Sequence, residues 1–454
     1  MDLSAANTGL WNGVLQFGLL SAAMLAAYLL YKHIKLIRKS MMPVAVCAGF
    51  MLLAARYLGL KLDDGLLEGV VYHALAFGFI ASALRTNAGG KGAQGGRTGI
   101  KSGAVIVSTY LVQGILGLII SLALSYTVMP GLFRASGILL PMGYGQGPGQ
   151  ANNIGTVFES LGFEGGRSFG LSIAAMGYLV ACVIGVIMLN VLRRKNMIRL
   201  PEGGQSNKRT VVEDEAKNSV PVSLDALSLQ VGIVALIYFA TYWVSLGLTS
   251  AITAIAPSAE GTVSQLIWGF NFIIGSALGL LFRFVTGRVR RDANGDERER
   301  ANESLNRISG ICFDYMIIAG IASIKLEDIR SLWVPFLLMT VLGGAVTWLY
   351  LKKICKRVYP DYYSQGLIAM FGMLTGTISS GVLLLREIDP ELSTPAANQL
   401  LVGSGFAIIL GAPMLVLISV APKSDLMTWL SLGIMVVYLS LLLLLIYAKK
   451  RKTA

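Results

Sequence analysis

Polar side chains gather in two glycine-rich stretches of an otherwise apolar chain. The first stretch reads GYGQGPGQANNIG and the second reads LTGTISSG. Amide and hydroxyl groups offer oxygen ligands to a hard cation and hydrogen-bond donors to an anion. The candidate ion- or substrate-binding side chains are Gln146, Gln150, Asn152, Asn153 and Thr156 in the first stretch and Thr375, Thr377, Ser379 and Ser380 in the second.

The glycines of these stretches have their own expected role. Glycine lets a helix unwind and expose backbone carbonyls without steric cost. The alternative is structural, with the polar groups satisfying only freed backbone and interhelical contacts. The glycines concerned are Gly143, Gly145, Gly147, Gly149, Gly155, Gly376 and Gly381.

Asp314 and Arg386 are further candidates, and both are ionisable. Asp314 is the only acid well inside a normal apolar span, where an unpaired charge is costly, so it is a candidate sodium ligand, proton carrier or partner of a cation. A wetted position near the cytoplasmic end is the alternative. Arg386 can hold a carboxylate by two hydrogen bonds or pair with Glu387. For Gln113 and Asn271, which lie mid-span, interhelical hydrogen bonding is the favoured role.

Composition identifies the elements that must position these residues. Of the 454 residues, 54% are hydrophobic and 14% are charged, whereas about 25% are charged in ordinary soluble domains. This excludes a soluble globular protein, and apolar stretches of about 20 residues are each long enough to cross a bilayer as a helix. We predict an all-α polytopic membrane protein with eleven spans, at residues 10–31, 43–60, 66–84, 103–128, 169–192, 227–250, 263–284, 308–324, 332–350, 399–420 and 427–448.

The basic residues orient these spans. Of the 38 Lys and Arg residues, 29 fall in the loops assigned to the inside and six in those assigned to the outside. Cytoplasmic loops of membrane proteins carry such an excess. The count therefore predicts an N-terminus outside and a C-terminus inside, and it explains the net charge of +13 without nucleic acid.

Two apolar stretches, 136–163 and 366–387, do not fit as spans because either would spoil the alternation of charge. Each is predicted to be a re-entrant hairpin, the first entering from outside and the second from inside. The distance along the sequence from a hairpin to its flanking spans is nearly the same for both hairpins. This predicts two inverted repeats of five spans plus a hairpin. The first repeat covers 1–192, a cytoplasmic linker 193–222, the second repeat 223–422, and an extra C-terminal helix 423–454.

A short local match supports the repeats. With one gap, four residues of the first hairpin align with four of the second, namely Gly149, Asn152, Asn153 and Gly155 with Gly376, Ser379, Ser380 and Gly381. Inverted repeats with broken membrane helices are typical of secondary transporters, whose site lies where the repeats meet.

With these hairpins and their polar tips, the chain resembles the sodium/glutamate symporter family, which is related in architecture to the 2-hydroxycarboxylate transporters. The likeness covers residues 10–420, and the last span is additional to the ten-span pattern. The resemblance implies sodium-coupled uptake of glutamate or a similar anion, a homodimer, and an elevator-like movement of the part that bears the hairpins. We therefore expect a multi-pass protein of a bacterial-type inner membrane, with Na⁺ as coupling ion and no other metal or cofactor.

Other functions remain open at this stage. A proton- or sodium-coupled transporter of another amino acid or of a di- or hydroxycarboxylate fits the same pattern. An intramembrane serine protease is disfavoured because His73 lies in the other repeat, and an aspartyl protease because it needs a second membrane aspartate. A channel is disfavoured because no filter sequence appears. The four cysteines form no CxxC pair and the chain has two histidines, so no metal cluster or disulfide framework is expected.

Overall fold

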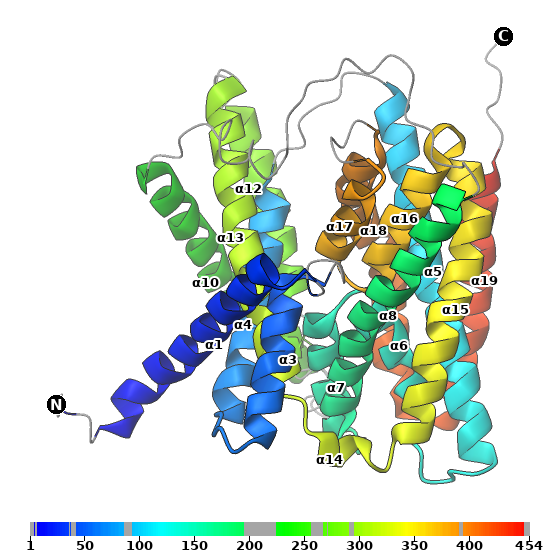
Figure 1. The fold of residues 1–454 in the computed structure, drawn as a ribbon, viewed down its shortest axis with the longest axis horizontal. Coiled ribbons are helices and arrows are strands. Elements are labelled where there is room, and N and C mark those ends of the chain that lie inside the picture. Colours follow the sequence, from blue (N-terminus) through cyan, green and yellow to red (C-terminus); the bar gives the residue numbers. More distant parts are fainter. Residues whose placement is uncertain are drawn as a thin grey trace. The chain divides into compact units, whose positions relative to one another are not determined.

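The computed structural model describes residues 4, 7–35, 37, 42–85, 93–194, 224–255, 267–269, 271–289, 295–389 and 394–448. Every secondary-structure element in these ranges is a helix (Figure 1). Nine of these helices are long and apolar enough to cross a membrane. The expected all-α membrane protein is therefore confirmed at this level.

The predicted spans compare closely with these helices. Nine of the eleven coincide with the long helices, and the other two coincide with shorter ones, α3 (Val44–Tyr57) and α12 (Asn271–Val289). A 14-residue helix such as α3 is about 21 Å long, less than the hydrocarbon thickness of a bilayer. The number of spans thus stays a prediction.

The chain divides into two compact units, and each takes helices from both predicted repeats. Unit 1 comprises Met1–Leu29, Cys47–Ala88 and Val211–Ser323, and unit 2 comprises Leu30–Val46, Gly89–Thr210 and Ile324–Ala454. Most of the predicted linker 193–222 lies outside the described residues. The repeats describe a chain order, whereas the units describe packing, so the two divisions need not agree.

Unit 1 is built around α4 (Asp64–Leu84), which packs against α12, α13 (Gly295–Ala322) and α10 (Leu224–Ile255). Most of α1 (Thr8–His33) and α3 also belongs to it. Gly78 allows a close approach, because a Cβ there would lie 2.6 Å from the ring of Phe313. The core contains Ile80, Val234 and Ile308.

The start of α4 is fixed by acidic residues outside the apolar segment. Asp63 is the N-cap, and its carboxylate accepts hydrogen bonds from the backbone N–H of Leu66 and from Asn12. The Leu66 N–H and then the Asn12 amide hold the pKa of Asp63 below its usual value. Arg56 adds an ion pair to Asp64 at 2.7 Å.

Unit 2 is built around α5 (Ala93–Tyr126). This helix packs against α15 (Trp333–Val358), α18 (Ala396–Val420) and α19 (Asp425–Tyr447). Close approaches at glycine allow this packing, since a Cβ on Gly103 would lie 2.6 Å from the Phe406 side chain. The long helix α8 (Gly166–Arg194) completes the frame, and α14 (Leu326–Ile329) precedes α15.

Two pairs of short helices fill this frame. The first pair follows the 3-10 helix η1 (Arg134–Ile138) and consists of α6 (Leu139–Tyr144) and α7 (Pro148–Ser160). The second pair, α16 (Tyr363–Thr375) and α17 (Ile378–Arg386), follows η3 (Pro360–Tyr362). Figure 1 shows the two pairs toward opposite ends of unit 2. Both predicted hairpin stretches are thus broken helices, whereas their re-entry into a membrane stays a prediction.

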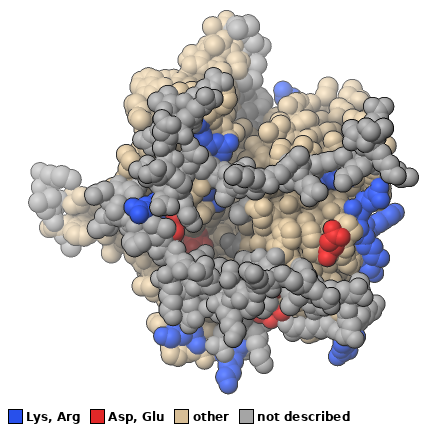
Figure 2. Space-filling view, turned by 90° about the horizontal axis from the view of Figure 1, so that it is seen from above, with Lys and Arg blue, Asp and Glu red and all other residues tan. Residues whose placement is uncertain are grey.

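The extra C-terminal helix α19 is fastened to unit 2 at both ends, the first end following η4 (Ala421–Lys423). Asp425 pairs with Arg134, and Trp429 stacks on Tyr126. At the other end, Lys101 Nζ donates to the carbonyl of Ile446 at 3.0 Å. Figure 2 views that end, where Lys and Arg side chains gather along the edge on the side of α15 and α19.

Candidate functional site

The two helix breaks meet inside unit 2. A Cβ built on Gly147, in the first break, would lie 3.5 Å from Cγ2 of Thr377 and 3.9 Å from the carbonyl oxygen of Gly376, both in the second break. Gly147 has φ +85° and ψ −176°, a conformation that only glycine adopts readily. Residues about 230 positions apart in the chain are therefore in contact.

Two long helices contact this junction, α8 through a glycine and α5 through a tyrosine ring. A Cβ on Gly177 of α8 would lie 2.3 Å from the carbonyl oxygen of Thr375 and 3.0 Å from the Tyr144 ring. A Cβ on Gly145 would lie 2.4 Å from the ring of Tyr110 on α5. The junction is thus closely packed, and α8 passes against the ends of both α6 and α16.

Four helix ends converge at the junction. Helices α7 and α17 begin there, while α6 and α16 end there. Neither N-cap residue, Gly147 or Thr377, forms a side-chain capping hydrogen bond. Pro148 at the first position of α7 has no N–H, so the N–H groups that can face an anion are those of Gly149 and Gln150 in α7 and those of the first turn of α17. The last carbonyls of α6 and α16 carry the partial negative charge that attracts a cation.

Four buried oxygen atoms near these ends lack a hydrogen-bond partner among the described residues. Gln150, Asn152 and Ser380 are only 2–4% exposed. A buried polar atom without a partner costs about 1–3 kcal/mol, so such a cluster signals a ligand or a functional strain. The atoms are Oε1 of Gln150, Oδ1 of Asn152, Oγ1 of Thr377 and Oγ of Ser380.

The helix starts reveal a correspondence that differs from the sequence match. Counted from the N-caps Gly147 and Thr377, the third helical residues are Gln150 and Ser380. Both carry an unpartnered buried oxygen. The local sequence match paired Asn152 with Ser379 instead, so the structural register of the two breaks differs from it.

The other predicted tip residues have various environments. Gln146 is partly buried in the first break, and buried Asn153 accepts a 3.4 Å contact from Asn152. Thr156 is exposed and donates to the carbonyl of Asn152, while Thr375 donates to that of Phe371. The side chain of Ser379 lies outside the described part of the structure.

The remaining predicted glycines serve close packing. A Cβ on Gly155 would lie 2.6 Å from Cα of Arg167, and one on Gly381 would lie 2.5 Å from the carbonyl oxygen of Ala369. Gly143 packs similarly against α8, where a Cβ would meet the backbone nitrogen of Ala174 at 2.8 Å. Gly149, in the first turn of α7, is buried.

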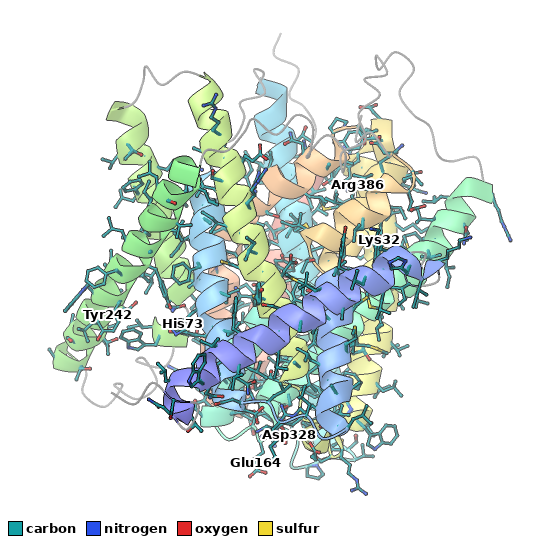
Figure 3. The ribbon with its side chains drawn as sticks, turned by 60° about the vertical axis from the view of Figure 1, so that its left-hand side comes forward. Lys32, His73, Glu164, Tyr242, Asp328 and Arg386 are labelled. Carbon is teal, nitrogen blue, oxygen red and sulfur yellow. The ribbon has the colours of Figure 1, made fainter. Side chains whose placement is uncertain are left out.

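Neither of the two ionisable candidates is among the residues that form the junction in unit 2. Asp314 belongs to unit 1, where its side chain is exposed on α13 and has no hydrogen bond within the described residues. Arg386 lies in the last turn of α17, nine residues after Thr377. Figure 3 shows Arg386 at the end of unit 2 opposite to Glu164 and Asp328.

Interhelical hydrogen bonding is confirmed for Gln113 and Asn271. Gln113 Nε2 donates to Thr347 Oγ1 at 2.9 Å and to the Leu374 carbonyl at 2.8 Å. Asn271 Nδ2 donates to the hydroxyl of Tyr238 at 3.2 Å, which also bonds His73. Sequence reasoning missed Tyr110 and Gly177 as neighbours of the junction, and it missed Tyr178, whose hydroxyl oxygen would lie 3.9 Å from a Cβ on Gly147. Nothing in their own spans marks these residues.

Other sites compete poorly with the junction. The described residues hold no group of three or more His, Cys, Asp or Glu side chains suited to a metal ion. Unit 1 contains an open, apolar groove of about 470 Å³ beside His73 and Tyr315. Convergent polar groups, which mark a specific small-molecule site, are found instead at the junction in unit 2.

No protein-family model matches the chain, and no curated protein matches it.

Proposed function

We propose that the protein is a secondary active transporter that couples sodium entry to the uptake of glutamate or a similar small amino-acid or carboxylate anion. The observation that carries the proposal is the meeting of two broken helices, with unpartnered buried oxygens at both. Broken helices at a repeat interface are how many secondary transporters build their sites. The re-entrant, inverted arrangement of the hairpins is part of the proposal.

The helix N-termini are the positive groups that the junction offers to a substrate anion. Among the described buried side chains, only Arg167 and Asp389 are charged. Arg167 packs near Gly155, eight residues beyond the N-cap of α7, and Asp389 bonds Thr394 beyond α17. A substrate carboxylate would therefore be neutralised by the helix N-termini of α7 and α17, and Na⁺ by carbonyl, amide and hydroxyl oxygens.

Alternating access would follow from the division into two units. Unit 2 carries both junction-forming pairs, so it would move in an elevator-like manner, while unit 1 would form the scaffold and the homodimer contact. The protein would lie in a bacterial-type inner membrane with its N-terminus outside. Eleven spans would give this topology.

A second candidate is coupling to protons in place of sodium. It is favoured by Asp314, an acid within an apolar helix that has no hydrogen bond in the described residues. A carboxylate at such a place is costly when charged and readily takes a proton. Replacement of Asp314 by Asn would then abolish proton-driven uptake.

The test is uptake of labelled L-glutamate into proteoliposomes with an inward sodium gradient, an inward proton gradient or neither. We expect sodium-driven accumulation that is lost in Gln150→Ala and Ser380→Ala. Ser276→Ala is the matched control, because Ser276 is equally buried but lies in unit 1 and bonds the carbonyl of Phe272. Absence of uptake of glutamate and of competing amino acids and carboxylates under either gradient would contradict the proposal.

A further inference from the structure

Gln113 connects three helices of unit 2 from a position without solvent access. It lies on α5 and is 0% exposed. Its Nε2 donates to Oγ1 of Thr347 on α15 and to the carbonyl oxygen of Leu374 on α16. The side chain thus reaches the last turn of the helix that ends at the junction.

These contacts fix which way the amide faces. The amide oxygen and nitrogen are assigned from the hydrogen-bond network, and the Leu374 carbonyl can only accept, so it must face the NH₂ group. The oxygen Oε1 consequently lies on the other side of the amide. There it has no hydrogen-bond partner among the described residues.

The position of Gln113 relates this oxygen to the site. Leu374 is the next-to-last residue of α16, where carbonyl groups have no donor within the helix. One turn earlier on α5, the ring of Tyr110 packs against Gly145 in the other break. One face of α5 therefore touches the ends of both broken helices.

We infer that Oε1 of Gln113, on the side of the amide away from the Leu374 carbonyl, is a ligand of the coupling cation near the C-terminal end of α16. A neutral carbonyl oxygen held beside the carbonyl end of a broken helix is the kind of ligand that Na⁺ takes in such sites. The Nε2 hydrogen bonds would hold the oxygen in place. This inference rests on the proposed function, because it assigns a residue to the sodium site.

The experiment is thermal unfolding of the full-length purified protein over a range of NaCl, with N-methylglucamine chloride keeping the ionic strength constant. We expect the wild-type Tm to rise with sodium. In Gln113→Leu the half-saturating sodium concentration should rise at least tenfold, which corresponds to about 1.4 kcal/mol.

Thr347→Val is the control that separates binding from packing. It removes an acceptor of Nε2 and leaves Oε1 in place, so the half-saturating sodium concentration should stay within twofold of wild type. If Gln113 only ties helices together, both variants will lower Tm and neither will change the sodium dependence. That result would overturn the inference and leave the proposed function standing.

A second variant keeps the test decisive if Gln113→Leu does not fold. Gln113→Asn retains the amide but is shorter by one methylene, so the oxygen cannot reach the same place. We expect its half-saturating sodium concentration to rise at least threefold, and an unchanged value would contradict the inference. A wild-type protein whose Tm ignores sodium would contradict both the inference and sodium coupling.

Discussion

Gln150 and Ser380 each hold a buried side-chain oxygen without a hydrogen-bond partner in the described part of the chain. Folding takes such atoms away from water, and that loss is normally offset by a protein hydrogen bond. Gln150 and Ser380 occupy the same position in α7 and α17, and neither side-chain oxygen has such a hydrogen bond among the described residues. Under the proposed function, a bound ligand supplies the missing contacts.

Ser380→Ala tests this reasoning without transport. Because the hydroxyl is unpartnered, its removal should leave the free energy of unfolding unchanged or raise it by about 1 kcal/mol. The same variant should weaken the stabilisation of the protein by glutamate and sodium. Denaturant titration of the protein in detergent, with and without these ligands, measures both effects.

The control is again Ser276→Ala, whose hydroxyl bonds its own helix. It should change the free energy of unfolding by less than about 1 kcal/mol and keep the ligand effect. Loss of more than this from Ser380→Ala in the absence of ligand would show that its hydroxyl has a structural partner.

At the scale of elements, both breaks depend on backbone conformation more than on side-chain contacts. A Cβ on Gly147 would be in ordinary contact with Thr377 at 3.5 Å, so space is not what requires glycine there. The requirement comes from φ +85° with ψ −176°. This conformation is strained for residues with a Cβ by about 1–3 kcal/mol.

Gly147→Ala should therefore lower the free energy of unfolding by about 1–3 kcal/mol and disturb the start of α7. Gly433→Ala on α19 is the matched control, because its backbone is helical and, apart from its chain neighbours and its own helix backbone, no atom of the described residues lies within 4 Å of a Cβ built there. Alanine there should be neutral or add about 0.5–1 kcal/mol. Equal stability of the two variants would contradict the assigned conformation.

The elements were largely predictable from the sequence, but their meeting was not. Apolar stretches predicted the long helices, and the glycines around Gly147 and Gly376 predicted the two breaks, because both signals are local. The contact of Gly147 with Thr377 depends on tertiary packing, which no local pattern encodes. The roles of Gly177 and of Tyr110 were hidden for the same reason, since their spans look ordinary.

The orphan oxygen of Gln113 shows the same limit at a single residue. A mid-span glutamine predicts an interhelical hydrogen bond, and that bond is present. Only the positions of Thr347 and Leu374 reveal that, among the described residues, the amide is bonded on its nitrogen side alone.

At the scale of the whole molecule, the membrane topology determines from which side of the membrane each predicted hairpin enters. The charge distribution predicts that Arg330 is outside and that Lys352–Arg357 is inside. Arg330 precedes α15 and Lys352–Arg357 belongs to its C-terminal turns, and the 26 residues of this helix span about 39 Å. Both Arg330 and Lys353 are exposed. One helix of unit 2 therefore offers a reporter at each of its ends.

Cysteine labelling at these two positions tests the topology on which the inverted hairpins depend. In a background in which Cys47, Cys182, Cys312 and Cys355 are replaced by Ser or Ala, a membrane-impermeant maleimide should label Arg330→Cys in intact cells. Lys353→Cys should be labelled only after the membrane is permeabilised, because basic loops stay on the cytoplasmic side. Labelling of both variants in intact cells would mean that α15 does not cross the membrane. The reverse pattern would invert the chain, and the α16–α17 pair, which follows Lys353, would then enter from outside.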